Sequence, residues 1–238
     1  VLNVLNGGSL TVEKMMDHPE ISGLTFVGST NVARDLRAKG IQVNKRVQAF
    51  GSGKNHLLVL PDADIDMVAD AAVSAGFGAA GQRCMAVSVL VIVGDIADKL
   101  VHKITERIPE IIVGSAHDKN VQLGPVISAK SRDRIHSFIE NAEENGAEII
   151  VDGRQEYLDK GFTVGATVID RVRPGMPIYD NEIFGPVLSI VRVDTYEEAM
   201  KIIAGHPLGN GSAIFTRDGG AARLFSEEVE AGMIGINV

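Results

Sequence analysis

The chain contains a single cysteine, Cys84, in the stretch FGAAGQRCMAVS at residues 77–88. A lone cysteine is most often a small buried hydrophobic residue. Here, however, the glycines and alanines before Cys84 leave little side-chain bulk, so a substrate could approach the backbone closely. Arg83 is the adjacent residue, and a positive charge beside a thiol favours the nucleophilic thiolate, although Arg83 can equally be a surface arginine. The residues alone therefore leave two interpretations, a buried hydrophobic residue and a nucleophile.

A cysteine hydrolase would also need a histidine base and an orienting asparagine or aspartate. The six histidines stand at positions 18, 56, 102, 117, 136 and 206, and none of them forms a recognisable pairing in the sequence. No cysteine and histidine cluster has the spacing of zinc ligands, so we predict no metal site. A hydrolase remains a third interpretation, which a histidine within hydrogen-bonding reach of the sulfur would support.

Three further stretches combine glycine with polar or aromatic residues at the ends of apolar runs. They are FVGST at 26–30, NEIFGPV at 181–187 and HPLGNGSAIFT at 206–216. Taken singly, each is compatible with an ordinary turn, and the chain has no G-x-G-x-x-G motif.

The elements needed to position these residues are short apolar runs that alternate with helical periodicity, which predicts an α/β fold with a mostly parallel sheet. We expect strands at 1–5, 23–27, 45–50, 56–60, 87–93, 148–151, 187–193, 211–216 and 233–237. We expect helices at 9–16, at 31–39 closed by Gly40, from an Asp62 or Asp64 cap to Phe77, and at 95–107, 129–145, 195–204 and 219–229. Because ligands bind at the carboxyl ends of parallel strands, Ser29 lies where a phosphate or ribose is expected.

Composition excludes several classes of function. The 238 residues carry a formal charge of -8 with pI near 5.3, and their scattered basic residues argue against nucleic-acid binding. No apolar run is long enough for a membrane span, and no signal peptide is apparent. One cysteine cannot form an internal disulfide, which predicts a reducing compartment, the cytoplasm or, in a eukaryote, the mitochondrial matrix. Both ends read as apolar strands, so we expect a piece of a longer protein, with a domain change near residues 50–53.

Six motifs together connect these observations. FVGST at 26–30, GKN at 53–55, GQRC at 81–84, EIFGPV at 182–187, PLGNGSAIFT at 207–216 and GINV at 235–238 occur in the order and approximate spacing of the aldehyde dehydrogenase superfamily, which the whole chain resembles. More narrowly, KRVQAFGSGKNH at 45–56, GQRCMA and EIFGPVLSIVRV are similar to the CoA-acylating methylmalonate-semialdehyde dehydrogenases. The resemblance implies that residues 1–50 are the C-terminal part of a Rossmann-like NAD-binding domain and residues 51–238 the catalytic domain.

The resemblance also implies a role for each matching residue. Cys84 would attack the aldehyde carbon and, after hydride transfer to NAD, remain as a thioester, with the oxyanion held by its own N–H and by an asparagine of the N-terminal portion. Ser29 would lie beside the NAD pyrophosphate and Gly51 near the nicotinamide. Glu182 would bind the ribose hydroxyls of the nicotinamide half, and Phe184 would lie beside the ring.

One position departs from the hydrolytic members of the family. They carry a glutamate base four residues before the motif lysine, where this chain has Phe50. Phenylalanine cannot accept a proton, so we expect slow hydrolysis and transfer of the acyl group to coenzyme A. The substrates implied by the resemblance, malonate and methylmalonate semialdehyde, carry a carboxylate, for which Arg83 is the expected partner. Decarboxylation before CoA attack would give acetyl-CoA or propionyl-CoA.

Two alternatives stay open beside this leading interpretation. One is an NAD-dependent dehydrogenase of another small aldehyde that releases the free acid, and the other is a non-catalytic member of the same fold. The resemblance further implies a homodimer or homotetramer for the full-length protein, with no nucleic-acid or membrane partner. We expect these 238 residues alone to bind NAD poorly.

Overall fold

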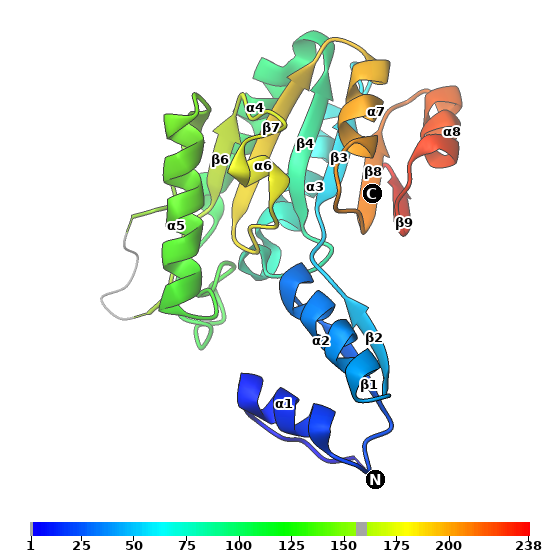
Figure 1. Cartoon of the computed structure of the whole chain (residues 1–238). Helices are drawn as coiled ribbons and strands as arrows, with labels where there is room; N and C mark the ends of the chain where they lie inside the picture. The colour runs from blue at the N-terminus through cyan, green and yellow to red at the C-terminus, as the bar shows by residue number, and fades with distance from the viewer. Residues whose placement is uncertain (1, 156–160) are drawn as a thin grey trace. The chain divides into compact units, whose positions relative to one another are not determined.

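The computed structural model describes residues 2–155 and 161–238, which form two compact units, Val1–Ser52 and Gly53–Val238 (Figure 1). Each unit is described by itself. No helix in the described residues is both long and apolar enough to cross a lipid bilayer.

The first unit is a small α/β arrangement around two parallel strands. Its elements are α1 (Ser9–Asp17), β1 (Gly23–Val27), α2 (Thr30–Gln42) and β2 (Arg46–Phe50). Val27 pairs with Phe50 at the carboxyl ends of the two strands, and helix α2 follows β1 directly. The predicted strand–turn–helix–strand order is therefore confirmed in this unit.

Two predictions in the first unit are wrong. Residues 2–5 are not a strand, and Leu2 is 89% exposed, because an apolar run becomes a strand only where a neighbouring strand accepts its hydrogen bonds. Helix α2 also continues past Gly40 to Gln42. A Cβ at Gly40 would collide with the Val47 side chain, so this glycine permits close packing of α2 on β2 and does not end the helix.

The second unit contains a seven-stranded sheet in the order β5-β6-β7-β4-β3-β8-β9. The strands are β3 (Asn55–Val59), β4 (Val87–Val93), β5 (Glu148–Val151), β6 (Thr167–Asp170), β7 (Val187–Val193), β8 (Gly211–Phe215) and β9 (Met233–Ile236). All neighbouring pairs are parallel except β5–β6. The mostly parallel α/β sheet predicted from the sequence is therefore confirmed, although β6 was not predicted.

Helices cover both faces of this sheet, as Figure 1 shows. The α-helices are α3 (Ile65–Phe77), α4 (Ala97–Arg107), α5 (Ala129–Glu144), α6 (Pro177–Asp180), α7 (Tyr196–Ala204) and α8 (Gly219–Glu228), and the 3-10 turns are Gly78–Gly81, Gly94–Ile96 and Ile108–Glu110. Of these, α6 was not predicted. The core is apolar: all five residues of β3 and the last five of β4 are buried, as expected for central strands with helices on both faces.

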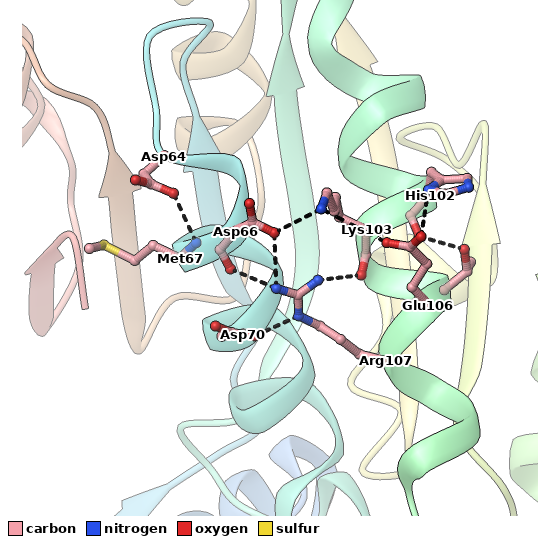
Figure 2. A network of polar contacts seen from close by, with 9 residues as sticks. Asp64, Asp66, Met67, Asp70, His102, Lys103, Glu106 and Arg107 are labelled. Atoms are coloured by element: carbon pink, nitrogen blue, oxygen red, sulfur yellow. Dashed lines mark hydrogen bonds and ion pairs between the residues drawn. The ribbon is translucent and has the colours of Figure 1, made fainter.

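Helix α3 leads directly into the cysteine loop and is held by a capping carboxylate at its N-terminus and by ion pairs along its first turns. Its N-cap is Asp64, whose carboxylate accepts from the Met67 N–H at 3.2 Å. Along its exposed side, Arg107 of α4 binds Asp66 and Asp70 (Figure 2). Each exposed ion pair contributes little alone, but Arg107 joins two turns of α3 to one point of α4.

The amino ends of four central strands meet at one edge of the sheet, because β3, β4, β7 and β8 are all parallel. Cys84 precedes β4, Glu182 and Phe184 precede β7, and Asn210 precedes β8. In this unit the predicted site residues therefore gather at the amino edge of the sheet, opposite to the edge where open α/β sheets usually bind ligands.

Candidate active site

The Cys84 loop leaves helix α3 through three consecutive residues in left-handed backbone conformation. Ala79 and Ala80 have φ of 54°, and Gly81 has φ of 67°. Alanine rarely adopts this conformation, and such strained residues concentrate at functional sites. A Cβ at Gly81 would collide with the carbonyl of Gly185, so the glycine lets the cysteine loop lie directly against the loop before β7. Cys84 itself is exposed, which rules out a buried hydrophobic role within this unit.

A small cavity of about 20 Å³ joins the predicted residues of the second unit, and Arg83, Cys84, Glu182 and Phe184 all line it. Its volume is that of about one water molecule, so this unit alone does not enclose a substrate. Glu182 accepts a hydrogen bond from the Gly53 N–H at 3.2 Å. Phe184 has φ of 51° and its side chain is 39% exposed.

The N–H of Cys84 is available to a ligand. The Arg83 carbonyl, which belongs to the same peptide group, accepts from the Ala86 N–H at 3.0 Å, which fixes the plane of that peptide. Within residues 2–155 and 161–238, the Cys84 N–H donates no hydrogen bond. An N–H held in a fixed direction beside a thiol is suited to stabilise the negative charge that develops on a carbonyl oxygen when the sulfur attacks the carbonyl carbon.

Two asparagines that the sequence analysis did not single out hold the carbonyl of Cys84. Asn55 Nδ2 donates to it at 2.8 Å and Asn210 Nδ2 at 2.6 Å. Asn55 belongs to the motif GKN and Asn210 to the motif PLGNGSAIFT, so the sequence analysis included both residues. Their contact with Cys84, however, is visible only in the folded structure.

Lys54 is a third residue without a predicted role. Its side chain is 1% exposed, and Nζ donates to the carbonyls of Ile178 and Asn181, both at 2.7 Å. Burial lowers the pKa of Lys54 from 10.5 to about 7, against the opposing attraction of Glu182 and Asp180. Lys54 thereby fixes the segment that carries Glu182.

A buried aromatic cluster lies behind this segment. His56 Nε2 is 3.2 Å from Tyr179 Oη, and the His206 ring stacks edge-on against both rings. Burial, with smaller contributions from His206 and Lys54, lowers the pKa of His56 to about 3, so this histidine is neutral. In the described part of the second unit no histidine hydrogen-bonds to the sulfur of Cys84, which argues against a cysteine hydrolase.

Arg83 contacts the protein itself. Its Nη2 donates to the Ser74 carbonyl at 3.0 Å and lies 3.5 Å from the Ala75 carbonyl, both at the C-terminus of α3. The side chain is exposed and its guanidinium has further donors. Its predicted role as a partner for a substrate carboxylate stays a prediction.

Ser29 and Gly51 belong to the first unit and follow its two paired strands. Ser29 is the N-cap of α2, and its carbonyl accepts from the Ala33 N–H at 3.0 Å. Beside Gly51, the Ser52 N–H donates to Thr30 Oγ1 at 3.0 Å, so the segments after β1 and β2 are bound to each other. The predicted pyrophosphate position is thus a helix N-terminus, which suits an anion. Phe50, the last residue of β2, is 49% exposed.

Among residues 2–155 and 161–238, no group of three or more histidine, cysteine, aspartate or glutamate side chains is arranged to hold a metal ion. The candidate site of the second unit therefore consists of an exposed thiol, an available N–H and a carboxylate. The first unit, taken by itself, offers a helix N-terminus at Ser29.

The sequence profile of the aldehyde dehydrogenase family matches residues 1–238. The chain belongs to this family. It is 45% identical to a malonate-semialdehyde dehydrogenase of Pseudomonas aeruginosa over 242 aligned residues, which cover 100% of this chain and 49% of the relative.

Solved structures give the same picture. A methylmalonate-semialdehyde dehydrogenase of Oceanimonas doudoroffii is similar with a TM-score of 0.94 and 45% identity, over 98% of this chain and 49% of the other. An NAD complex of a Sinorhizobium meliloti protein has a TM-score of 0.94 and 43% identity, over 98% and 48%. The chain thus spans about half the length of the relatives that it matches.

Proposed function

We propose that the protein to which this chain belongs oxidises malonate or methylmalonate semialdehyde with NAD through a thioester on Cys84, and transfers the acyl group to coenzyme A. The observation that carries this proposal is the exposed Cys84 with an available N–H, in one cavity with Glu182 and Phe184. The names of the relatives, malonate- and methylmalonate-semialdehyde dehydrogenase, support the class of substrate.

Cys84 supplies the covalent chemistry. Its thiolate attacks the aldehyde carbon, the C–S bond forms, and the carbonyl electron pair moves to oxygen. The Cys84 N–H is placed to donate to that oxygen. When the negative charge returns to form the thioester carbonyl, the hydride leaves the carbon. Sulfur suits both steps, because it is a good nucleophile toward a carbonyl and a good leaving group from a thioester.

The residues of this chain fit NAD. The Glu182 carboxylate offers two acceptor oxygens to a ribose diol, and its contact with the Gly53 N–H is one that a ligand can replace. Phe184 presents an exposed ring beside the cysteine loop, and Ser29 marks a helix N-terminus for the pyrophosphate. Bound NAD supplies the acceptor for the hydride.

Release of the acyl group is the step at which the proposal differs from hydrolysis. Phe50 cannot activate water because it has no group that accepts a proton. His56 lies in the core, where its Nε2 is hydrogen-bonded to Tyr179 Oη. A carboxylate β to the thioester carbonyl can leave as CO2 when the intervening C–C bond breaks, and the resulting enolate takes up a proton. The CoA thiolate then attacks the thioester, its new C–S bond forms, and Cys84 leaves as thiolate. Arg83 is the proposed partner of the substrate carboxylate.

The test is NADH formation by the full-length protein from malonate and methylmalonate semialdehyde, with and without CoA. We expect a single turnover without CoA and continued turnover with it, and no NADH from Cys84→Ala. Continued turnover without CoA would replace this proposal by a second candidate, a dehydrogenase that releases the free acid. NADH from the Cys84→Ala variant would remove the thioester mechanism altogether.

The same resemblance supports a homodimer or homotetramer as the proposed state of the full-length protein. Sedimentation of that protein measures it directly, and a monomer at micromolar concentration contradicts it.

A further inference from the structure

Two side-chain amides from separate segments of the chain meet at one backbone carbonyl. Asn55 is the first residue of β3, and Asn210 directly precedes β8. Their Nδ2 atoms reach the carbonyl of Cys84 at 2.8 Å and 2.6 Å. A carbonyl oxygen has two lone pairs, so the two amides occupy its accepting capacity.

The Asn55 amide has a hydrogen-bonding partner for its Nδ2 hydrogens and for its Oδ1. Its second Nδ2 hydrogen binds the Ala86 carbonyl at 2.7 Å, and its Oδ1 accepts from the Gly211 N–H at 2.8 Å. The side chain is 5% exposed. Since every donor and acceptor is engaged, the amide has one orientation, and it joins the start of β3, the cysteine loop and the start of β8.

Asn210 is exposed and has φ of 111°, a backbone conformation that asparagine tolerates better than most residues. Its carbonyl accepts from the Met233 N–H at 3.0 Å, which ties it to the start of β9. Its Nδ2 is also 3.1 Å from the Met85 sulfur. Asn210 thus binds the cysteine loop at the protein surface.

We propose that Asn55 and Asn210 are positioning residues for the nucleophile, which they serve by fixing the Cys84–Met85 peptide so that the Cys84 N–H stays directed at the developing oxyanion. This inference rests on the proposed role of Cys84. The Arg83 carbonyl, bound to the Ala86 N–H, fixes the peptide before Cys84, and the two asparagines fix the peptide after it. With both peptides held, the cysteine backbone cannot rotate.

The decisive variant is Asn210→Asp in the full-length protein. It keeps the shape of the side chain but places a carboxylate oxygen against the Cys84 carbonyl, so an attraction becomes a repulsion. Asn145→Asp is the matched control. Asn145 is also exposed and donates from Nδ2 to a backbone carbonyl, that of Asn141 at 2.7 Å, at the C-terminal end of α5.

Two reactions of Cys84 separate positioning from a general disturbance of the loop. With 4-nitrophenyl acetate, the thiolate attacks the ester carbonyl, the S–C bond forms through an oxyanion, the C–O bond breaks and 4-nitrophenolate leaves. With iodoacetamide, the thiolate displaces iodide from a saturated carbon and no oxyanion forms. Only the first reaction needs the Cys84 N–H in place.

Both rates are compared at the high-pH plateau, where the thiol is fully ionised and the added negative charge no longer changes the thiolate fraction. There we expect Asn210→Asp to slow acylation by the ester by about tenfold or more, while its alkylation rate stays within about twofold of the wild type. Asn145→Asp should leave both rates unchanged. Equal acylation rates for Asn210→Asp and the wild type would overturn the inference, and so would an equal loss in both reactions, because that result describes a displaced loop.

Asn55→Asp provides the second variant, and we expect a larger loss of acylation because two carbonyls face the new carboxylate. Its burial predicts lower stability, so its rates are compared after circular dichroism has established that it is folded. Neither reaction requires aldehyde, NAD or CoA. Failure of the wild type to oxidise any semialdehyde would therefore refute the proposed function while the acylation comparison still decided the role of the asparagines.

Discussion

Replacing Lys54 by methionine removes a buried amine on which the Glu182 segment depends. Lys54 is 1% exposed, and its Nζ donates to the carbonyls of Ile178 and Asn181 at 2.7 Å each. Methionine fills similar space but leaves both carbonyls without their donor. Each buried carbonyl left unpaired costs about 1–3 kcal/mol. The variant should therefore be less stable than the wild type at pH values at which the Lys54 amine is neutral in the folded protein.

The pH dependence of this loss follows from the pKa of Lys54. Burial lowers it to about 7 in the folded protein, whereas the unfolded chain keeps the ordinary value of 10.5. Between these values the unfolded state binds more protons, so the free energy of unfolding rises with pH through Lys54. With these two pKa values, the contribution grows by about 2–3 kcal/mol on going from pH 8 to pH 10. Methionine does not titrate, so the stability difference between wild type and variant should widen by that amount.

Urea unfolding at a series of pH values measures this difference, since the other groups titrate in both proteins and largely cancel. Leu57→Ala is the matched control, because Leu57 is 1% exposed on β3, the strand that directly follows Lys54, and its loss costs about 2–5 kcal/mol without adding or removing a titrating group. Its stability deficit should stay constant with pH. A Lys54→Met deficit that also stayed constant would refute the assignment of a depressed pKa to Lys54.

Three other substitutions test the packing and charge of the second unit. Gly81 has φ of 67°, and Gly81→Ala would place a Cβ against the Gly185 carbonyl. We expect the free energy of unfolding in urea to fall by about 2 kcal/mol or more. An unchanged midpoint would contradict the close approach of the two loops. Asp170→Asn weakens the ion pair between the Asp170 carboxylate, which is 1% exposed on β6, and Arg192 of β7. The free energy of unfolding, measured by thermal unfolding, should fall by about 3 kcal/mol. An unchanged unfolding free energy would show that the ion pair does not stabilise the fold. Glu182→Gln should raise the Kd of the full-length protein for NAD by about tenfold in fluorescence titration, and an unaltered Kd would exclude the ribose role.

Much of the fold follows from local sequence pattern. The run VSVLVIV at 87–93 is apolar except for Ser88 and is followed by Gly94, and it forms β4 with those bounds. Strand β6, Thr167–Asp170, has four residues and was not predicted, because so short a run becomes a strand only through its register with β7 and β5. The end of α2 was misplaced for a related reason: Gly40 serves tertiary packing, which a local rule cannot see.

The site divides in the same way. Cys84, Glu182 and Phe184 were found through motifs and lie in one cavity. Asn210 and Lys54 were not assigned roles, because their contacts join residues more than a hundred positions apart, such as Asn210 with Cys84 and Lys54 with Ile178. A polar residue next to a strand gives no sign in the sequence of which distant carbonyl it will bind.

These long-range contacts explain how an exposed loop at the amino edge of the sheet can hold a nucleophile in place. Lys54 directly precedes β3 and Asn55 is its first residue. All β3 residues are buried, and from His56 onward the strand is paired with β4 on one side and β8 on the other, so its backbone is strongly constrained. From there, Lys54 holds the segment before β7 and Asn55 holds the loop before β4. The two loops that carry Glu182 and Cys84 are therefore both held at the start of one strand, in addition to their direct contact at Gly81 and Gly185. The glycine-rich loop is therefore insufficient by itself. If it were grafted into a relative that lacks the asparagine at the start of the neighbouring strand, the loop would still present the thiol. Its N–H, however, would be free to turn away from the oxyanion.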